Sequence, residues 1–120
     1  MRYLVVLHSK PATTPPPPEL MQGIMALGEE ATRAGALLDT AGLAPSAQGA
    51  RVQVADGKIT VTDGPFAEAK EMISYAIYQV RDREEAVEWT NRFMKLHRDH
   101  WAGWEGEAQV LRVMGPEDFA

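Results

Sequence analysis

The chain has 120 residues and a formal net charge of −5, with 12 Lys and Arg against 17 Asp and Glu. DNA and RNA binding depends on clustered cationic side chains, so this balance argues against nucleic acid as a direct partner and offers no attraction to an anionic membrane surface. Apolar residues make up 45%, enough for one domain with a core across residues 1–120, and the lack of cysteine excludes disulfides, thiolate zinc sites and cysteine nucleophiles.

The N-terminal part predicts a strand, a stiff connection and a helix. Tyr3 to Leu7 is a short β-branched run with two apolar faces, both of which need a cover. The prolines of Pro11 to Pro18 suit neither a helix interior nor a strand ladder, so we interpret this segment as an extended connection rather than a ligand for an aromatic groove. From about Pro18 to Ala34 apolar residues recur every three or four positions, which predicts an amphipathic helix that Gly35 ends.

The middle of the chain predicts a β-hairpin. Ala36 to Leu38 is a candidate short strand, and Asp39 to Gly49 is predicted to be a loop. Apolar and polar residues then alternate on both sides of Asp56-Gly57, a dipeptide typical of two-residue hairpin turns. The polar positions of the hairpin (Arg51, Gln53, Lys58, Thr60 and Thr62) predict one solvent-exposed face.

The last part predicts a long strand, a helix and a final strand. Met72 to Val80 is apolar on both sides, which indicates a central strand. The alternation places Ile73, Tyr75 and Ile77 on one face and Met72, Ala76, Tyr78 and Val80 on the other. Asp82 followed by Glu85 is typical of a capping box and predicts a helix to about His97 or His100, and Ala108 to Met114 follows as a strand.

Reduced to its long elements, this order is βαββαβ with an added hairpin. It predicts an α+β, ferredoxin-like split βαβ fold, with an antiparallel sheet and two helices on one face. Two helices leave the second face uncovered, although the first and central strands are apolar there. We therefore expect a homodimer, in which a second copy packs sheet to sheet. A monomer at micromolar concentration would refute this argument.

One segment resembles a known signature. Asp63-Gly64-Pro65-Phe66-Ala67-Glu68-Ala69-Lys70-Glu71 is similar to the signature of DGPF-domain proteins, which are part of the YCII-related family. The hairpin tip (Val54, Asp56, Gly57 and Lys58), Gly35-Ala36-Leu37-Leu38 and Gly42-Leu43-x-Pro45 also resemble family members. The resemblance covers almost the whole chain and implies a dimeric α+β barrel.

Two departures from the family pattern affect the function that the resemblance implies. Many members carry Gly-Gly-Tyr or Gly-Gly-Phe after the signature, where this chain has Met72-Ile73-Ser74-Tyr75. Enzyme-like members carry a His on the first helix, paired with an Asp; that position falls near Met25 here, so the dyad does not carry over. The family mostly lacks an assigned activity, and some members lie beside genes for alternative sigma factors.

The signature has a structural and a functional interpretation. As a corner, Gly64 adopts a positive φ, Asp63 hydrogen-bonds nearby backbone and Phe66 fills the end of the sheet. As a site, Asp63, Gly64, Pro65, Phe66, Glu68 and Lys70 form a ligand-binding loop at the barrel mouth. In that site Lys70 fixes an anionic ligand and a carboxylate accepts a proton.

Histidines and tryptophans give further candidates. His8, at the end of the first strand, is either a proton-transfer group or an ordinary edge residue. His97 and His100 lie three residues apart on a helix and are weak metal candidates, for which Asp99, Glu105 or the partner chain would have to supply further ligands. The alternative is that the two imidazoles cap the end of the helix. We interpret Trp101 and Trp104 as core or interface residues.

Three functions follow as hypotheses. The first is a small-molecule-binding homodimer whose pocket lies between the helix side and the Asp63 to Lys70 loop. The second is a non-catalytic accessory or regulatory protein linked to sigma-factor-dependent transcription. The third is an acid–base enzyme that uses His8 and Asp63. We predict no cofactor, since the sequence has neither a Walker loop nor a Gly-x-Gly-x-x-Gly motif. We predict a cytoplasmic location, because no apolar run suits a signal or a membrane span.

Overall fold

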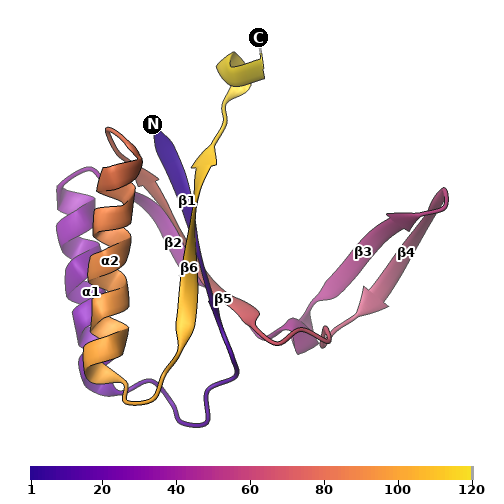
Figure 1. Ribbon diagram of the computed structural model, residues 1–120, viewed down its shortest axis with the longest axis horizontal. Helices are drawn as coiled ribbons and strands as arrows, with labels where there is room; N and C mark the ends of the chain where they lie inside the picture. Colours follow the sequence, from indigo (N-terminus) through magenta and orange to yellow (C-terminus); the bar gives the residue numbers. More distant parts are fainter. Residues whose placement is uncertain (120) are drawn as a thin grey trace.

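In the computed structural model, which describes residues 1–119, two helices cover one face of a four-stranded sheet (Figure 1). The elements are β1 (Arg2–Ser9), α1 (Pro18–Arg33), β2 (Leu37–Gly42), the 3-10 helix η1 (Ser46–Gln48), β3 (Ala50–Ala55), β4 (Lys58–Asp63), β5 (Glu71–Gln79), α2 (Arg83–His100), β6 (Gly106–Val113) and the 3-10 helix η2 (Pro116–Phe119). The sheet order is β2-β5-β1-β6 with antiparallel neighbours, which confirms the predicted ferredoxin-like α+β fold.

The core lies between the sheet and the helices. Its buried residues are Tyr3, Val5, Ala31, Ala36, Tyr78, Val80 and Ala86. The ring of Tyr78 on β5 stacks on Trp89 of α2 with ring centroids 6.5 Å apart, which joins the sheet to the second helix. The helix-facing side of the sheet is therefore covered within the chain.

Local sequence signals set the ends of both helices. Pro18 opens α1, and Gly35 follows it with a φ of +74°, a conformation that suits glycine. The Asp82 side chain accepts a hydrogen bond from the Glu85 backbone N–H at 2.9 Å, which starts α2. These features confirm the predicted positions of the helix ends. Only the Asp82 half of the predicted capping box is present, because the Glu85 carboxylate accepts a hydrogen bond from Arg81 Nε at 2.6 Å.

A glycine inside α1 offers a stabilising substitution. A Cβ added at Gly28 would make one ordinary van der Waals contact, with Leu37 Cδ2 at 4.0 Å, whereas one at Gly23 would lie 2.9 Å from Leu96 Cδ2. Because alanine loses less entropy in a helix, Gly28→Ala is expected to raise the free energy of unfolding by about 0.5–1 kcal/mol in urea denaturation. A lowered value would show that position 28 has no room for a methyl group.

Strands β3 and β4 form a hairpin, hereafter the arm, that projects away from the body (Figure 1). Asp56 and Gly57 both have positive φ, as the predicted two-residue turn requires. The pairs Val52–Val61 and Val54–Ile59 place four apolar side chains on one face. These are 65% to 75% exposed. Both faces of the arm are thus open within the chain, and not only the polar one.

Two details of the predicted strands were wrong. Asp39–Gly42 belongs to β2 and not to a loop, because its backbone pairs with β5, and Thr40 Oγ1 also donates to the carbonyl of Tyr75 at 2.8 Å. Met72 does not share a face with Ala76, since a register shift between Leu7 and His8 interrupts the alternation and sets Met72 opposite His8.

The far side of the sheet, hereafter the open face, carries Leu4, Val6, His8, Tyr75, Ile77 and Leu111. Leu4 lies opposite both Ile77 and Leu111, and Leu111 is 48% exposed. In Figure 1 the arm leaves the body on the side of the sheet away from the helices. The open face and the arm therefore border the same concave space.

Candidate functional site

The signature loop lies where the arm meets the body, and it packs on η1 and on Gly49, which follows η1. The Gly64 N–H donates to the Gly49 carbonyl at 3.0 Å, and the Phe66 N–H donates to Ser46 Oγ at 3.2 Å. A Cβ at Gly64 would lie 1.7 Å from the Ser46 carbonyl oxygen. The predicted positive φ of Gly64 was wrong, because glycine is needed here for close approach and not for a left-handed turn.

A carboxylate and an ion pair hold this junction together. Oε1 of Glu71, at the start of β5, accepts hydrogen bonds from the Ser46 backbone N–H at 3.1 Å and from the Ser46 hydroxyl. Arg51 of the arm donates to Glu68 Oε1 at 2.8 Å, and its guanidinium lies 4.4 Å from the centre of the Phe66 ring. The loop, η1, the base of the arm and β5 are therefore mutually fixed.

A cavity of about 390 Å³ opens between η1 and the signature loop. Its wall consists of Leu43, Ala44, Pro45, Ser46, Gln48, Gly49, Phe66, Glu68, Glu71 and Met72. This volume, with apolar walls and a few polar groups, matches small-molecule sites in general.

The structure brings together only part of the predicted loop site. Phe66 and Glu68 line the cavity, and Gly64 packs behind it on Ser46. The Asp63 side chain is exposed and forms no hydrogen bond with residues 1–119, and Pro65 is also exposed. Lys70 lines a different groove, with its Nζ 3.9 Å from Glu107 Oε2.

Sequence reasoning missed the two best-placed polar groups, Ser46 and Glu71. Glu71 is the last residue of the signature, so a search of the whole signature for carboxylates would have included it. Ser46 lies in the segment predicted as a loop, about twenty residues from its partners, and no spacing pattern marks it.

His8 and Asp63 lie in different sheets, His8 near the end of β1 and Asp63 at the end of β4. His8 lies in β1 opposite Glu107 of β6, and its buried Nδ1 has no hydrogen-bond partner among residues 1–119. Neither His8 nor Asp63 belongs to the wall of the cavity beside the signature loop. The cavity beside the signature loop therefore contains neither member of the predicted pair.

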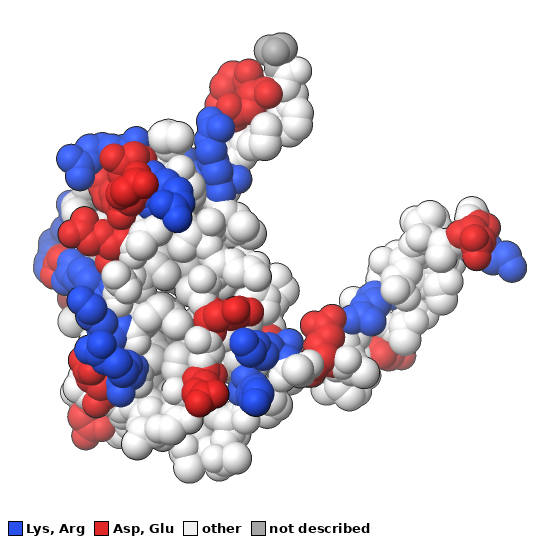
Figure 2. All heavy atoms as spheres, in the orientation of Figure 1, with Lys and Arg blue, Asp and Glu red and all other residues white. Residues whose placement is uncertain are grey.

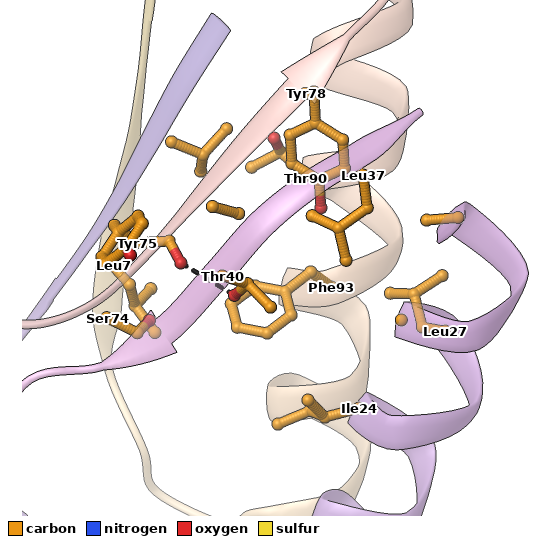
Figure 3. Close-up of a pocket in the computed structure, with 14 residues that line it drawn as sticks. Leu7, Ile24, Leu27, Leu37, Thr40, Ser74, Tyr75, Tyr78, Thr90 and Phe93 are labelled. Atoms are coloured by element: carbon orange, nitrogen blue, oxygen red, sulfur yellow. Dashed lines mark hydrogen bonds between the residues drawn. The ribbon is translucent and has the colours of Figure 1, made fainter. Parts of the chain in front are cut away.

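A second cavity, of about 70 Å³, lies between the helices and the sheet (Figure 3). Its wall is mostly apolar, and two of its hydroxyls already have backbone partners: Thr40 Oγ1 donates to the Tyr75 carbonyl and Thr90 Oγ1 to the Ala86 carbonyl, both at 2.8 Å. At roughly 10–15 Å³ for each water-sized sphere, this space holds only a few waters. We interpret it as a packing space of the core.

The two histidines at the end of α2 have different surroundings. His97 is buried, donates from Nδ1 to the Phe93 carbonyl at 3.0 Å, and contacts the rings of Phe93 and Trp104 at centroid distances of 4.6 Å. His100 is exposed, so the two imidazoles do not share an environment. Residues 1–119 contain no group of three or more His, Cys, Asp or Glu side chains arranged to hold a metal ion.

Burial lowers the pKa of His97 below its ordinary value of 6.5, and its bond to Phe93 only partly offsets this. As the pH falls below 6.5, the unfolded chain takes up this proton before the folded one, so the free energy of unfolding decreases. We expect a larger loss between pH 7.5 and pH 5.5 in the wild type than in His97→Gln, measured by urea denaturation. Equal losses in both proteins would contradict this.

A comparison with models of protein families gives a match. The family model of the YCII-related domain matches residues 1–105, which include both helices, the arm and the signature loop. A comparison with curated protein sequences gives no match. Among residues 1–119, no helix has the length and apolar character needed to cross a membrane.

Proposed function

The chain belongs to the YCII-related family, and from the geometry of its signature loop we propose that it is a homodimer that binds a small molecule beside that loop. The observation that carries this proposal is a carboxylate fixed in an otherwise largely apolar cavity. Glu71 Oε1 is held by the backbone and side chain of Ser46, and the cavity that both residues line has a volume of about 390 Å³.

The charges around the cavity define the kind of ligand. Arg51 pairs with Glu68, so the charge of Glu68 is compensated within the chain. Glu71 has no cationic partner within residues 1–119, and its Oε2 accepts no hydrogen bond there. A carboxylate accepts hydrogen bonds and favours positive charge. The matching ligand is a small, mostly apolar molecule with an amine or hydroxyl group.

A second copy is the natural cover for the open face. The arm exposes four apolar side chains, and the open face adds Leu111. In a two-fold dimer the same patch serves both copies, so each arm has an apolar surface available on its partner. Met72, which is 53% exposed, lines the cavity and pairs with His8 of the open face. Dimer formation over the open face would therefore close the cavity beside Met72.

Native mass spectrometry of the protein as purified tests this function. We expect a dimer that carries a small extra mass, and loss of that mass in Glu71→Gln and in Leu43→Arg, which fills the cavity. Met25→Arg is the matched control, because Met25 is 66% exposed and lies outside the wall of this cavity. Two results together would contradict the proposal. The wild-type dimer would carry no extra mass, and small apolar amines and alcohols would not raise its resistance to thermal unfolding.

One observation favours a non-catalytic role over acid–base chemistry. Neither His8 nor Asp63 lines the cavity, and each of the two carboxylates that do line it already has a partner, Glu68 with Arg51 and Glu71 with Ser46. The best-supported activity is thus binding, and an accessory or regulatory protein that senses its ligand is consistent with this geometry.

A further inference from the structure

A groove of about 700 Å³ runs between the end of α2, the start of β6 and the end of β1. Four cationic side chains line it, Lys10, Lys70, Lys95 and Arg98, against one carboxylate, that of Glu105. The whole chain has a charge of −5, so this local excess of positive charge runs against the overall balance. Figure 2 shows basic groups, with acidic groups among them, on the lower half of the body, where α2 ends and β6 begins.

The cations come from separate elements that the fold brings together. One face of α2 lines the groove, because its lining residues follow Asn91 by three, four and seven positions. These residues are Met94, Lys95 and Arg98. Lys10 follows β1, and Lys70 precedes β5. Lys10 and Lys95 form no ion pair within residues 1–119, and the Lys70–Glu107 distance of 3.9 Å is long for a salt bridge. Arg98 Nε donates to Asp99 Oδ1 at 2.8 Å, so the charge of Arg98 is compensated within the chain.

The groove also has an aromatic wall. The indoles of Trp101 and Trp104 stack with centroids 6.1 Å apart and planes 19° apart. Trp101 Nε1 donates to Thr14 Oγ1 at 3.1 Å, and a Cβ at Gly106 would lie 2.4 Å from Trp104 Cη2, so both rings are held in place. The buried Nε1 of Trp104 has no hydrogen-bond acceptor among residues 1–119.

We propose that this groove is a binding site for a small anion that carries a planar ring. The lysine ammonium groups attract the anionic group, and the fixed indoles offer a flat surface for the ring. A nucleoside monophosphate and an aromatic carboxylate both have this chemistry. The site is separate from the cavity beside the signature loop, because the two walls share no residue and Glu71 favours the opposite charge.

The indole N–H signals in two-dimensional ¹H–¹⁵N NMR of the full chain provide the readout. The chain has three tryptophans, and Trp89 packs on Tyr78 and Arg92, away from the groove, as an internal reference. Adenosine 5′-monophosphate and 1-naphthoate serve as probes, with adenosine as the uncharged match. We expect saturable shifts of Trp101 and Trp104 while Trp89 stays constant, with adenosine at least about tenfold weaker than its monophosphate.

Two variants separate a local site from general charge attraction. Lys95→Gln is expected to weaken binding about fivefold. Lys58→Gln removes the same charge at the tip of the arm and should leave the affinity for the probe unchanged. If only the monophosphate binds, the site recognises the phosphate group. If both anions bind, the site accepts any anion that carries a planar ring. No saturable shift with either anion, equal binding of adenosine, or equal weakening in both variants would overturn the proposal.

Discussion

Replacing Gly64 with alanine is expected to lower the free energy of unfolding by about 3 kcal/mol, the upper range for an overpacked site. The added Cβ would lie 1.7 Å from the carbonyl oxygen of Ser46 and 2.6 Å from its carbonyl carbon. These are backbone atoms of η1, whose position is fixed by hydrogen bonds from the Gln48 N–H to Pro45 and from the Gly49 N–H to Ser46, each 2.9 Å. Relief of the overlap therefore requires the loop and η1 to separate.

Chemical denaturation at equal protein concentration measures this effect, with Gly49→Ala as the matched control. A Cβ at Gly49 has ordinary contact with the Ser46 carbonyl oxygen at 3.5 Å, and the φ of −109° suits alanine. The control should change the free energy of unfolding by less than about 1 kcal/mol. Similar values for the two variants would show that the loop is free to move away from Ser46.

Replacing Val52 with lysine is expected to convert most of the proposed dimer to monomer. Val52 and its partner Val61 lie on the apolar face of the arm and are 65% and 66% exposed in the chain alone. Two-fold symmetry places the lysine at the interface twice, and burying an ammonium group without a partner is costly. If each of the two lysines weakens the dimer at least about tenfold, the dimer dissociation constant should rise at least about a hundredfold.

Analytical ultracentrifugation over a range of concentrations gives this constant. Gln53→Lys adds the same charge one residue away, on the polar face of the arm, where Gln53 pairs with Thr60. It should leave the dimer intact. A Val52→Lys protein as dimeric as Gln53→Lys would place the arm outside the interface, and the open face alone would then have to account for a dimer.

The fold was predictable because its main signals are local. The apolar spacing of α1, Gly35 after it, the Asp82 cap of α2 and the Asp56-Gly57 turn each specify structure within a few residues. The far half of β2 was not predictable. Thr40 to Gly42 lack an apolar alternation, and they form a strand because β5 supplies hydrogen-bond partners more than thirty residues away.

The candidate site was predictable only in part, for a similar reason. The signature identified the loop, and Phe66 and Glu68 line the cavity as expected of a site there. The fixed position of Glu71 depends on Ser46, which the chain brings near through η1. Lys70 is one residue before Glu71 but faces another groove, so closeness in sequence did not mean a shared site.

The central place of β1 in the sheet determines when the protein can fold. β1 leaves the ribosome well before its partners β5 and β6, which lie more than sixty residues further along the chain, with Arg2 opposite Val113. Closing such long loops slows folding, because the entropy of closure is lost before the contacts form. The helix α1 and the arm can form early, whereas the sheet has to wait until β6 is synthesised. Nascent chains that stop before Gly106 therefore keep one edge of an apolar strand unpaired, which exposes them to chaperones and to aggregation.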